Sequence, residues 1–132
     1  MIEAYANTDF RVGAHIPFVL KIGIQNKSLL ELYAQEKFDC AAYITAFNPY
    51  SEERTEKENS DAQDSLLQQL SLSAFKIIEG SGQDPLGEWP SEPSALALGM
   101  SKTEAMDIGN KFRQNAIVWM GADAIPELIM LR

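Results

Sequence analysis

The segment from Cys40 to Phe47 constrains the fold of this chain most, because nearly every residue in it is apolar. A strand with one exposed face alternates apolar and polar side chains, whereas a strand covered on both faces is apolar throughout. The segment is also far shorter than the roughly 20 apolar residues that a membrane-spanning helix needs. We therefore expect a central strand that other parts of the chain cover, and no membrane span.

Shorter runs that are rich in β-branched and aromatic residues predict the remaining strands. The residues from Phe18 to Ile24 alternate between apolar and polar, as in a half-buried strand. The other predicted strands are 8–12, 75–79, 94–98, 115–120 and 128–131.

A Ser followed three residues later by Glu or Gln marks three predicted helix starts, at Ser28, Ser60 and Ser101. In such a capping box, two backbone amides that would otherwise be unpaired receive side-chain partners. Apolar residues follow each Ser at helical spacing. Gly109 lies on the apolar face of the third helix, where it costs about 1 kcal/mol relative to Ala. We therefore expect Gly109 to allow close packing of that helix against the sheet.

These elements follow one another in the order ββαβαββαββ. The predicted fold is α/β (or α+β), with a mixed β-sheet of about six or seven strands and three helices in two layers. A chain of 132 residues is expected to form a single domain, residues 1–132, without a disulfide or metal. We expect a β-α-β crossover made of the strand at 94–98, the helix from Ser101 and the strand at 115–120. The two strands of such a crossover should be parallel.

Two stretches break the pattern and are predicted as irregular. Residues 49–65 hold six acidic and two basic residues, which is half of the net charge of −8. Residues 80–93 hold three prolines and three glycines. Gly80-Ser-Gly82 is not followed by a helix that could hold a phosphate, so we interpret it as a turn. Long loops in small domains are often functional.

Composition excludes several classes of protein. The negative net charge opposes binding to nucleic acid, because the phosphate backbone is also negative. One Cys and one His cannot supply the four ligands of a structural zinc site, and we assign the chain no metal and no cofactor. The first residues, Met1 to Ala6, lack a basic region followed by an apolar run, so we expect a cytoplasmic protein without a signal peptide.

Few residues are candidates for catalysis. His15 is the only imidazole and lies in a predicted turn, and no G-x-S-x-G supplies a serine nucleophile. Cys40 begins the most apolar strand, where a thiol is expected to be inert. Glu58, Asp61 and Asp64 recur every three residues and could bind a divalent cation. Acidic residues also favour helix N-termini, and we prefer that interpretation.

Several short polar motifs occur beside the apolar strands in a fixed order: Thr45-Ala-Phe-Asn48-Pro49, Glu58-Asn59, Asp84-Pro-Leu-Gly-Glu-Trp89-Pro-Ser-Glu92, and Phe112-Arg-Gln114-Asn115-Ala116. From about Tyr43 to Trp119, the chain resembles a family of small bacterial proteins known only as a domain of unknown function. The resemblance implies a small single α/β domain. It supplies no activity, substrate or cofactor.

The directions of the predicted strands place these motifs at the same edge of the sheet. The N-terminal ends of two parallel strands share one edge of the sheet, and an antiparallel strand from Cys40 would end there too. We therefore predict a polar pocket at this edge, lined by Asn48, Asn59, Trp89, Glu92, Gln114 and Asn115. The competing interpretation is structural, because Asn and Gln side chains at strand ends often bind loop backbone and Trp89 could be an apolar lid.

Two functions fit these residues. The first is a binding or interaction module for an unknown protein or a small polar ligand, because amides form hydrogen bonds but do not titrate. The alternative is a small hydrolase or transferase with Glu92 as general base, assisted by a divalent ion on Glu92 and Glu58 or Asp61. That alternative requires a partly buried Glu92 with a raised pKa. The strand at 128–131 could also pair two copies of the chain into a homodimer.

Overall fold

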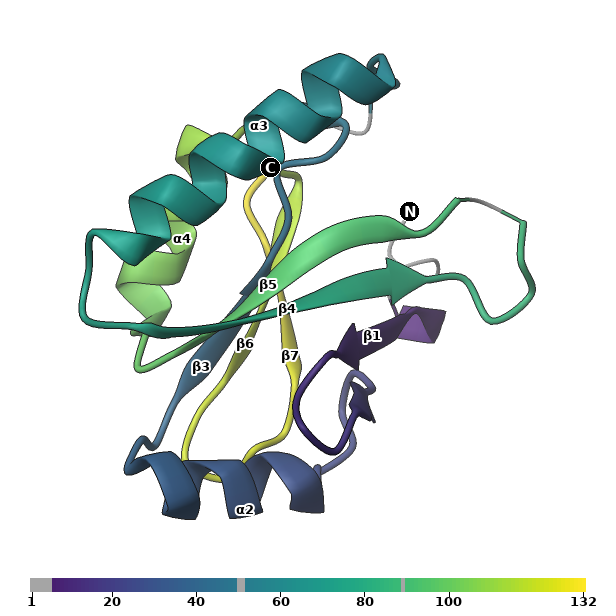
Figure 1. Ribbon diagram of the computed structural model, residues 1–132. Helices are drawn as coiled ribbons and strands as arrows, with labels where there is room; N and C mark the ends of the chain where they lie inside the picture. The colour runs from purple at the N-terminus through teal and green to yellow at the C-terminus, as the bar shows by residue number, and fades with distance from the viewer. Residues whose placement is uncertain (1–5, 50–51, 89) are drawn as a thin grey trace.

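A computed structural model describes residues 6–49, 52–88 and 90–132, whose strands form one sheet of seven (Figure 1). The elements are β1 (Asp9–Val12), β2 (Phe18–Leu20), α2 (Lys27–Glu36), β3 (Ala41–Ile44), α3 (Glu56–Ser71), β4 (Lys76–Gln83), β5 (Glu92–Leu98), α4 (Lys102–Lys111), β6 (Ala116–Met120) and β7 (Glu127–Met130). Their order along the chain confirms the predicted ββαβαββαββ sequence and the predicted fold class.

The strands lie in the order β2-β1-β4-β5-β3-β6-β7, and every neighbouring pair is antiparallel. As expected, β5 and β6 run parallel to each other, because each is antiparallel to β3. They are not neighbours, however, since β3 lies between them. The sheet is therefore antiparallel throughout, where a mixed sheet was expected.

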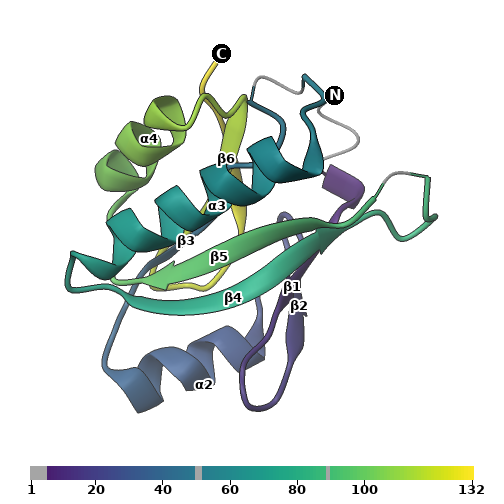
Figure 2. The same cartoon turned by 45° about the horizontal axis from the view of Figure 1, so that its top comes forward.

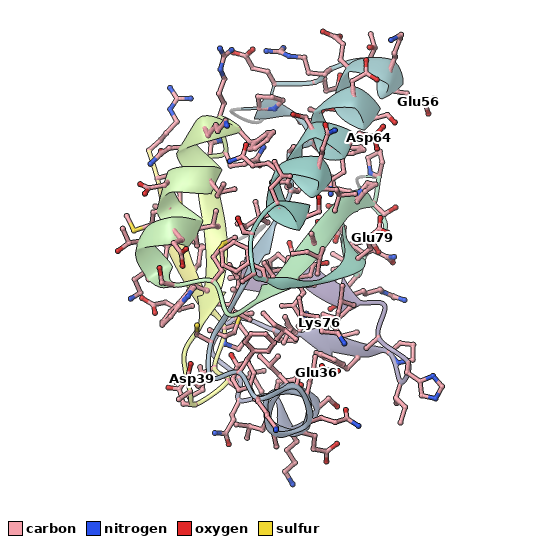
Figure 3. The ribbon with its side chains drawn as sticks, turned by 60° about the vertical axis from the view of Figure 1, so that its left-hand side comes forward. Glu36, Asp39, Glu56, Asp64, Lys76 and Glu79 are labelled. Atoms are coloured by element: carbon pink, nitrogen blue, oxygen red, sulfur yellow. The ribbon has the colours of Figure 1, made fainter. Side chains whose placement is uncertain are left out.

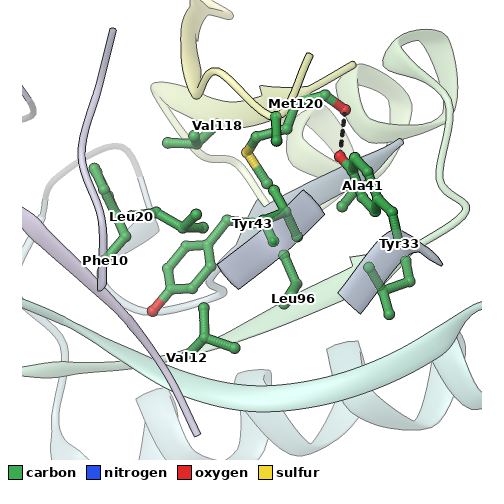
Figure 4. Close-up of a cluster of buried hydrophobic side chains, with 12 residues drawn as sticks. Phe10, Val12, Leu20, Tyr33, Ala41, Tyr43, Leu96, Val118 and Met120 are labelled. Carbon is green, nitrogen blue, oxygen red and sulfur yellow. Dashed lines mark hydrogen bonds between the residues drawn. The ribbon is translucent and has the colours of Figure 1, made fainter. Parts of the chain in front are cut away.

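The central strand β3 is buried over its whole length, which confirms its predicted position. Its side chains alternate between two apolar clusters. Tyr43 packs on one face with Leu29 of α2, within the cluster shown in Figure 4. Ile44 packs on the other face with Leu66 of α3. Figures 1 and 2 show the same arrangement, with α3 and α4 on one side of the sheet and α2 on the other. Helices thus cover both faces, which adds a second helical layer to the two layers that we expected.

The third predicted helix start is confirmed. The amide of Glu104 donates to Ser101 Oγ at 3.1 Å, and the amide of Ser101 donates to Glu104 Oε1 at 3.0 Å. Gly109 of the same helix also has its predicted role. A Cβ atom there would lie 2.5 Å from Leu131 Cδ1 and 2.6 Å from Ile117 Cγ2, so only glycine lets α4 approach the sheet this closely.

The other two helices begin earlier than predicted, and Ser28 and Ser60 are not their caps. Helix α2 is capped by Asn26, whose Oδ1 accepts from the amide of Leu29 at 2.9 Å. Helix α3 is capped by Thr55 in a capping box with Glu58. Asn is as suitable as Ser for this position, and Thr is also favoured there and has Glu58 three residues later for a capping box, so the sequence offers competing starts and the earlier ones are used.

The predicted turn at Gly80-Ser-Gly82 is wrong, because β4 continues through these residues to Gln83. Gly80 pairs with Val12 of β1 and with Ser94 of β5. A Cβ atom on Gly80 would collide with the Arg11 carbonyl, so the missing side chain permits the close approach of β1. The longer hairpin makes Glu92 the first residue of β5 and places it opposite Gly82.

Among the described residues, none of the helices has both the length and the hydropathy needed to cross a membrane.

Candidate functional site

Asn48 and Asn59 form the centre of the candidate site. Asn48 follows β3 with a φ of 44°, and Asn59 lies in the first turn of α3. The amide of Asn48 donates to Asn59 Oδ1 at 2.8 Å, and Asn59 Nδ2 donates to Asn48 Oδ1 at 2.8 Å. This reciprocal pair fixes the end of β3 to the start of α3.

Glu92 joins this pair from the start of β5. Asn48 Nδ2 donates to Glu92 Oε1 at 3.3 Å. Three side chains that are far apart in the sequence are thus connected by hydrogen bonds, and we call Asn48, Asn59 and Glu92 the polar cluster. Glu92 is half-buried. Burial raises the pKa of its carboxyl, and the hydrogen bond from Asn48 opposes part of that shift.

Gln114 and Asn115 lie beside the polar cluster, at the same edge of the sheet. Both are buried, just before β6. Gln114 Nε2 donates to the carbonyl of Phe47 at 3.2 Å and therefore reaches the residue next to Asn48. The carbonyl of Asn115 accepts from the amide of Leu131 at 2.7 Å. Trp89, the sixth residue of the predicted pocket, lies outside the described residues.

Gln63 belongs to the same edge, although the sequence motifs did not point to it. It is buried on α3, and its Oε1 accepts from the amide of Ala46 at 3.0 Å. It follows Asn59 by four residues, so the two amides share one face of the helix. Two features of the sequence could have identified Gln63. One is its four-residue spacing from Asn59, and the other is that both polar residues occupy the face of α3 that packs against the sheet, where apolar residues are expected.

The amides of the polar cluster use most of their hydrogen-bonding capacity within the chain. Asn48 Oδ1 accepts from Asn59 Nδ2 and from the amide of Arg54, and its Nδ2 is directed at Glu92. This pattern favours the structural interpretation for Asn48 and Asn59. Glu92 differs, because its second oxygen, Oε2, has no hydrogen-bond partner within the described part of the chain.

A model of a protein family described only as being of unknown function, DUF3293, matches residues 44–117, which is more than half of the chain. The chain belongs to the DUF3293 family. The resemblance to an uncharacterised domain family is thus confirmed. The polar cluster, Gln63, Gln114 and Asn115 all lie within the matched residues. Neither the curated proteins nor the solved structures contain a match to this chain.

The metal-assisted form of the enzyme hypothesis needs Glu58 or Asp61 beside Glu92 of the DUF3293 polar cluster. In the portion described here, no three His, Cys, Asp or Glu side chains are grouped so that they could hold a metal ion. Glu58 Oε1 accepts from the amide of Thr55 at 3.1 Å, as part of the helix cap. Asp61 pairs with Lys57 at 3.0 Å. Both of these carboxylates are instead bonded to other groups.

The cysteine and the histidine of this DUF3293 chain both lie away from the polar cluster. Cys40 immediately precedes β3 and is thus at the opposite end of that strand from Asn48. Burial raises the pKa of its thiol, and the carboxylates of Asp39 and Glu104 add to the shift, which disfavours the reactive thiolate. His15 is exposed in the turn between β1 and β2.

Proposed function

We propose that this DUF3293 chain is a binding module, and that a small polar ligand with a hydrogen-bond donor binds to Glu92 at the edge of the sheet. One observation carries the proposal. The Glu92 carboxylate is half-buried and held by Asn48 through one oxygen, while the other oxygen has no partner in the described residues.

Burial of a carboxylate costs free energy unless hydrogen bonds or an opposite charge replace the lost water. For Oε1 a single long hydrogen bond of 3.3 Å from a neutral amide replaces little of that water, whereas Oε2 is not a buried atom and remains open to solvent or to a ligand. An amine, guanidinium or hydroxyl group of a ligand would supply a second and stronger interaction. The amides of Asn48 and Asn59 then position the carboxylate before the ligand arrives, which lowers the entropic cost of binding.

A second candidate is the enzyme with Glu92 as general base. The raised pKa of Glu92 favours it, because a base works best when its pKa approaches the ambient pH. Binding has the stronger support, since the side chain that donates to Glu92 is the amide of Asn48, which is held in turn by the amide of Asn59, and neither amide titrates.

A thermal-shift screen tests the proposal. The probes are amino acids, simple amines, nucleotides and sugar phosphates, each with and without Mg²⁺. A ligand at a hundred times its dissociation constant adds about 2.7 kcal/mol to the free energy of unfolding. For a domain of this size, that gain raises the melting temperature by roughly 10 °C. We expect a probe that raises the melting temperature of the wild type and of Glu53→Gln, but not of Glu92→Gln. Glu53 is exposed and matches the lost charge.

A probe that stabilises Glu92→Gln as strongly as the wild type binds elsewhere and contradicts the proposal. The proposal is also contradicted if the wild type is well folded and no probe raises its melting temperature. Mass spectrometry of the stabilising probe after incubation separates the two candidates. An unchanged probe indicates binding, whereas conversion that is lost in Glu92→Gln indicates the enzyme.

A further inference from the structure

Strand β4 is paired along only part of its edge on the β1 side. Its other edge pairs with β5 along nearly the whole strand. On the β1 side, strand pairing reaches only to Gly80, and one further hydrogen bond joins the Gly13 amide to the Glu79 carbonyl at 2.9 Å. The chain then turns into β2. Among the residues that the structure describes, no strand pairs with residues 76–78 on this side, and we call them the open edge.

The backbone of Ile77 points out of this open edge. In an antiparallel pair, the N–H and C=O of one residue point to the same side, and successive residues alternate between the two sides. Because the Glu79 carbonyl points to β1, the N–H and C=O of Ile77 point to that side as well. Neither group has a hydrogen-bond partner within the described portion of the chain. An added strand pairs with a backbone donor and acceptor in this arrangement.

The open edge borders a groove of about 550 Å³ whose other wall is α2. Phe18, Leu32 and Ile78 line this groove, and each is half-buried and packs against the core cluster beneath. Lys76 Nζ pairs with Glu36 Oε1 at 2.8 Å, so an ion pair joins the two walls (Figure 3). The groove is therefore apolar inside, and its volume is typical of ligand pockets.

The two faces of β4 differ in chemistry at the open edge. Ile78 belongs to the core cluster beside α2, whereas Ile77 belongs to the cluster beside α3, on the opposite side of the sheet (Figures 1 and 2). Glu79 follows Ile77 by two residues and thus lies on the α3 face, where it is exposed. Its carboxylate has no ion-pair partner in the described residues. An added strand would thus meet apolar surface on one face and a negative charge on the other.

We propose that the open edge binds an extended peptide segment of another protein as an added antiparallel strand, with a basic residue between two apolar residues. The basic residue lies opposite Ile77, exchanges two backbone hydrogen bonds with it, and places its side chain on the face of Glu79. The apolar residues lie opposite Ile78 and Lys76 and project into the groove. Gly13 already occupies the position opposite Glu79, so the segment fills about 10 Å of the edge.

Hydrogen exchange measured by NMR on the isotope-labelled full chain tests whether the edge is open. The Ile77 amide should exchange about tenfold faster than the Ile78 amide, or more, because the Ile78 amide points to β5. An Ile77 amide that is as protected as that of Ile78 would show that the edge is already covered and would overturn the proposal.

The peptide acetyl-Val-Lys-Val-amide is the probe for binding. Its addition should shift the Ile77 amide resonance and slow the exchange of that amide. Methylation of the lysine backbone nitrogen removes the donor to the Ile77 carbonyl and should weaken binding about fivefold. The first valine nitrogen faces away from β4, so its methylation is the matched control and should leave the affinity unchanged. A probe that leaves Ile77 unaffected, or equal weakening by both methylations, would overturn the proposal.

The peptide acetyl-Lys-Val-Lys-amide tests the alternation of side chains. It carries more positive charge but directs its lysines into the apolar groove, so it should bind more weakly than acetyl-Val-Lys-Val-amide. Tighter binding would show that only charge is recognised and would overturn the strand assignment. Glu79→Gln should weaken the binding of acetyl-Val-Lys-Val-amide, whereas Glu53→Gln and Glu92→Gln should not, which separates the open edge from the polar cluster. Equal weakening in Glu79→Gln and Glu53→Gln would overturn the position of the basic residue.

Discussion

Asn48 and Asn59 exchange hydrogen bonds in both directions, at 2.8 Å each, between the end of β3 and the first turn of α3. The pair holds the backbone of Asn48 at a positive φ of 44°, a conformation that Asn tolerates better than most residues. Because Asn48 also donates to Glu92, the geometry of the proposed ligand site depends on this pair.

Asn59→Ala should therefore destabilise the chain. It removes both hydrogen bonds and leaves the amide of Asn48 without its acceptor, at an expected cost of about 1–3 kcal/mol. Urea unfolding monitored by circular dichroism measures this change. Asn110→Ala, an exposed position on α4, is the control and should be neutral. If Asn59→Ala changes the free energy of unfolding no more than the control does, the pair does not contribute to stability.

Gly109→Ala should destabilise the chain although it improves helix propensity. The added methyl group gains about 1 kcal/mol in an exposed helix. Here it would lie within 2.6 Å of both Ile117 and Leu131, so α4 must move away from the sheet. Overpacking of this kind costs about 1–3 kcal/mol. A rise in the midpoint of urea unfolding would show that α4 shifts without penalty.

Much of the fold could be predicted because its signals are local. Hydrophobic period and helix caps act over a few residues, and they predict, in order, the helices and strands that the structure describes from β1 to β7. The cap of α2 was placed at Ser28 and not at Asn26 because local rules rank these residues almost equally. The position of β3 between β5 and β6 depends on pairing across the whole chain, which no local signal reveals.

The candidate site, like the fold, could be predicted only in part. Chain direction was enough to place Asn48 near Gln114 and Glu92, and the register confirms that these positions share one edge. The hydrogen bonds among them could not be predicted. They depend on the positive φ of Asn48 and on the extension of β5 to Glu92, and that extension depends on β4 pairing through Gly80.

Gly80 and Gly82 provide a matched pair that tests this extension. A Cβ atom on Gly80 would collide with the Arg11 carbonyl, which also accepts from Tyr43 Oη at 2.7 Å. A Cβ atom on Gly82 would make an ordinary contact of 3.8 Å with Thr8. Gly80→Ala should thus cost about 1–3 kcal/mol through overpacking, whereas Gly82→Ala should be close to neutral. Equal effects in thermal unfolding would contradict the pairing of β1 with β4 at Gly80.

The homodimer remains a prediction, and it concerns the edge strand β7. Leu131 donates its amide to Asn115 at 2.7 Å, so the alternation of an antiparallel pair directs the amides of Met130 and Leu128 away from β6. These outward groups could pair with the same strand of a second copy. Met130→Pro removes one outward donor and should shift the chain to monomer in light scattering. A wild-type mass of 14.7 kDa at high concentration would contradict the dimer.

Glu92→Gln should stabilise the free chain near neutral pH, as expected if Glu92 serves binding at the expense of stability. A carboxyl with a raised pKa holds its proton more tightly in the folded chain than in the unfolded chain. The free energy of unfolding therefore falls as the pH rises from the ordinary pKa of 4.5 through the raised value. Gln carries no charge and keeps an oxygen that can accept from Asn48, so it should not show this loss.

Urea unfolding between pH 4 and pH 8 measures the effect of Glu92→Gln on the free energy of unfolding. We expect a gain in stability over the wild type that grows as the pH rises and disappears below pH 4.5. Glu53→Gln, at an exposed position, lowers the overall negative charge by the same amount and should show no such growth. A Glu92→Gln variant that is less stable than the wild type at pH 7 would mean that the ionised carboxylate is already well stabilised within the chain. The free oxygen would then no longer indicate a ligand site, and the binding proposal would lose its main support.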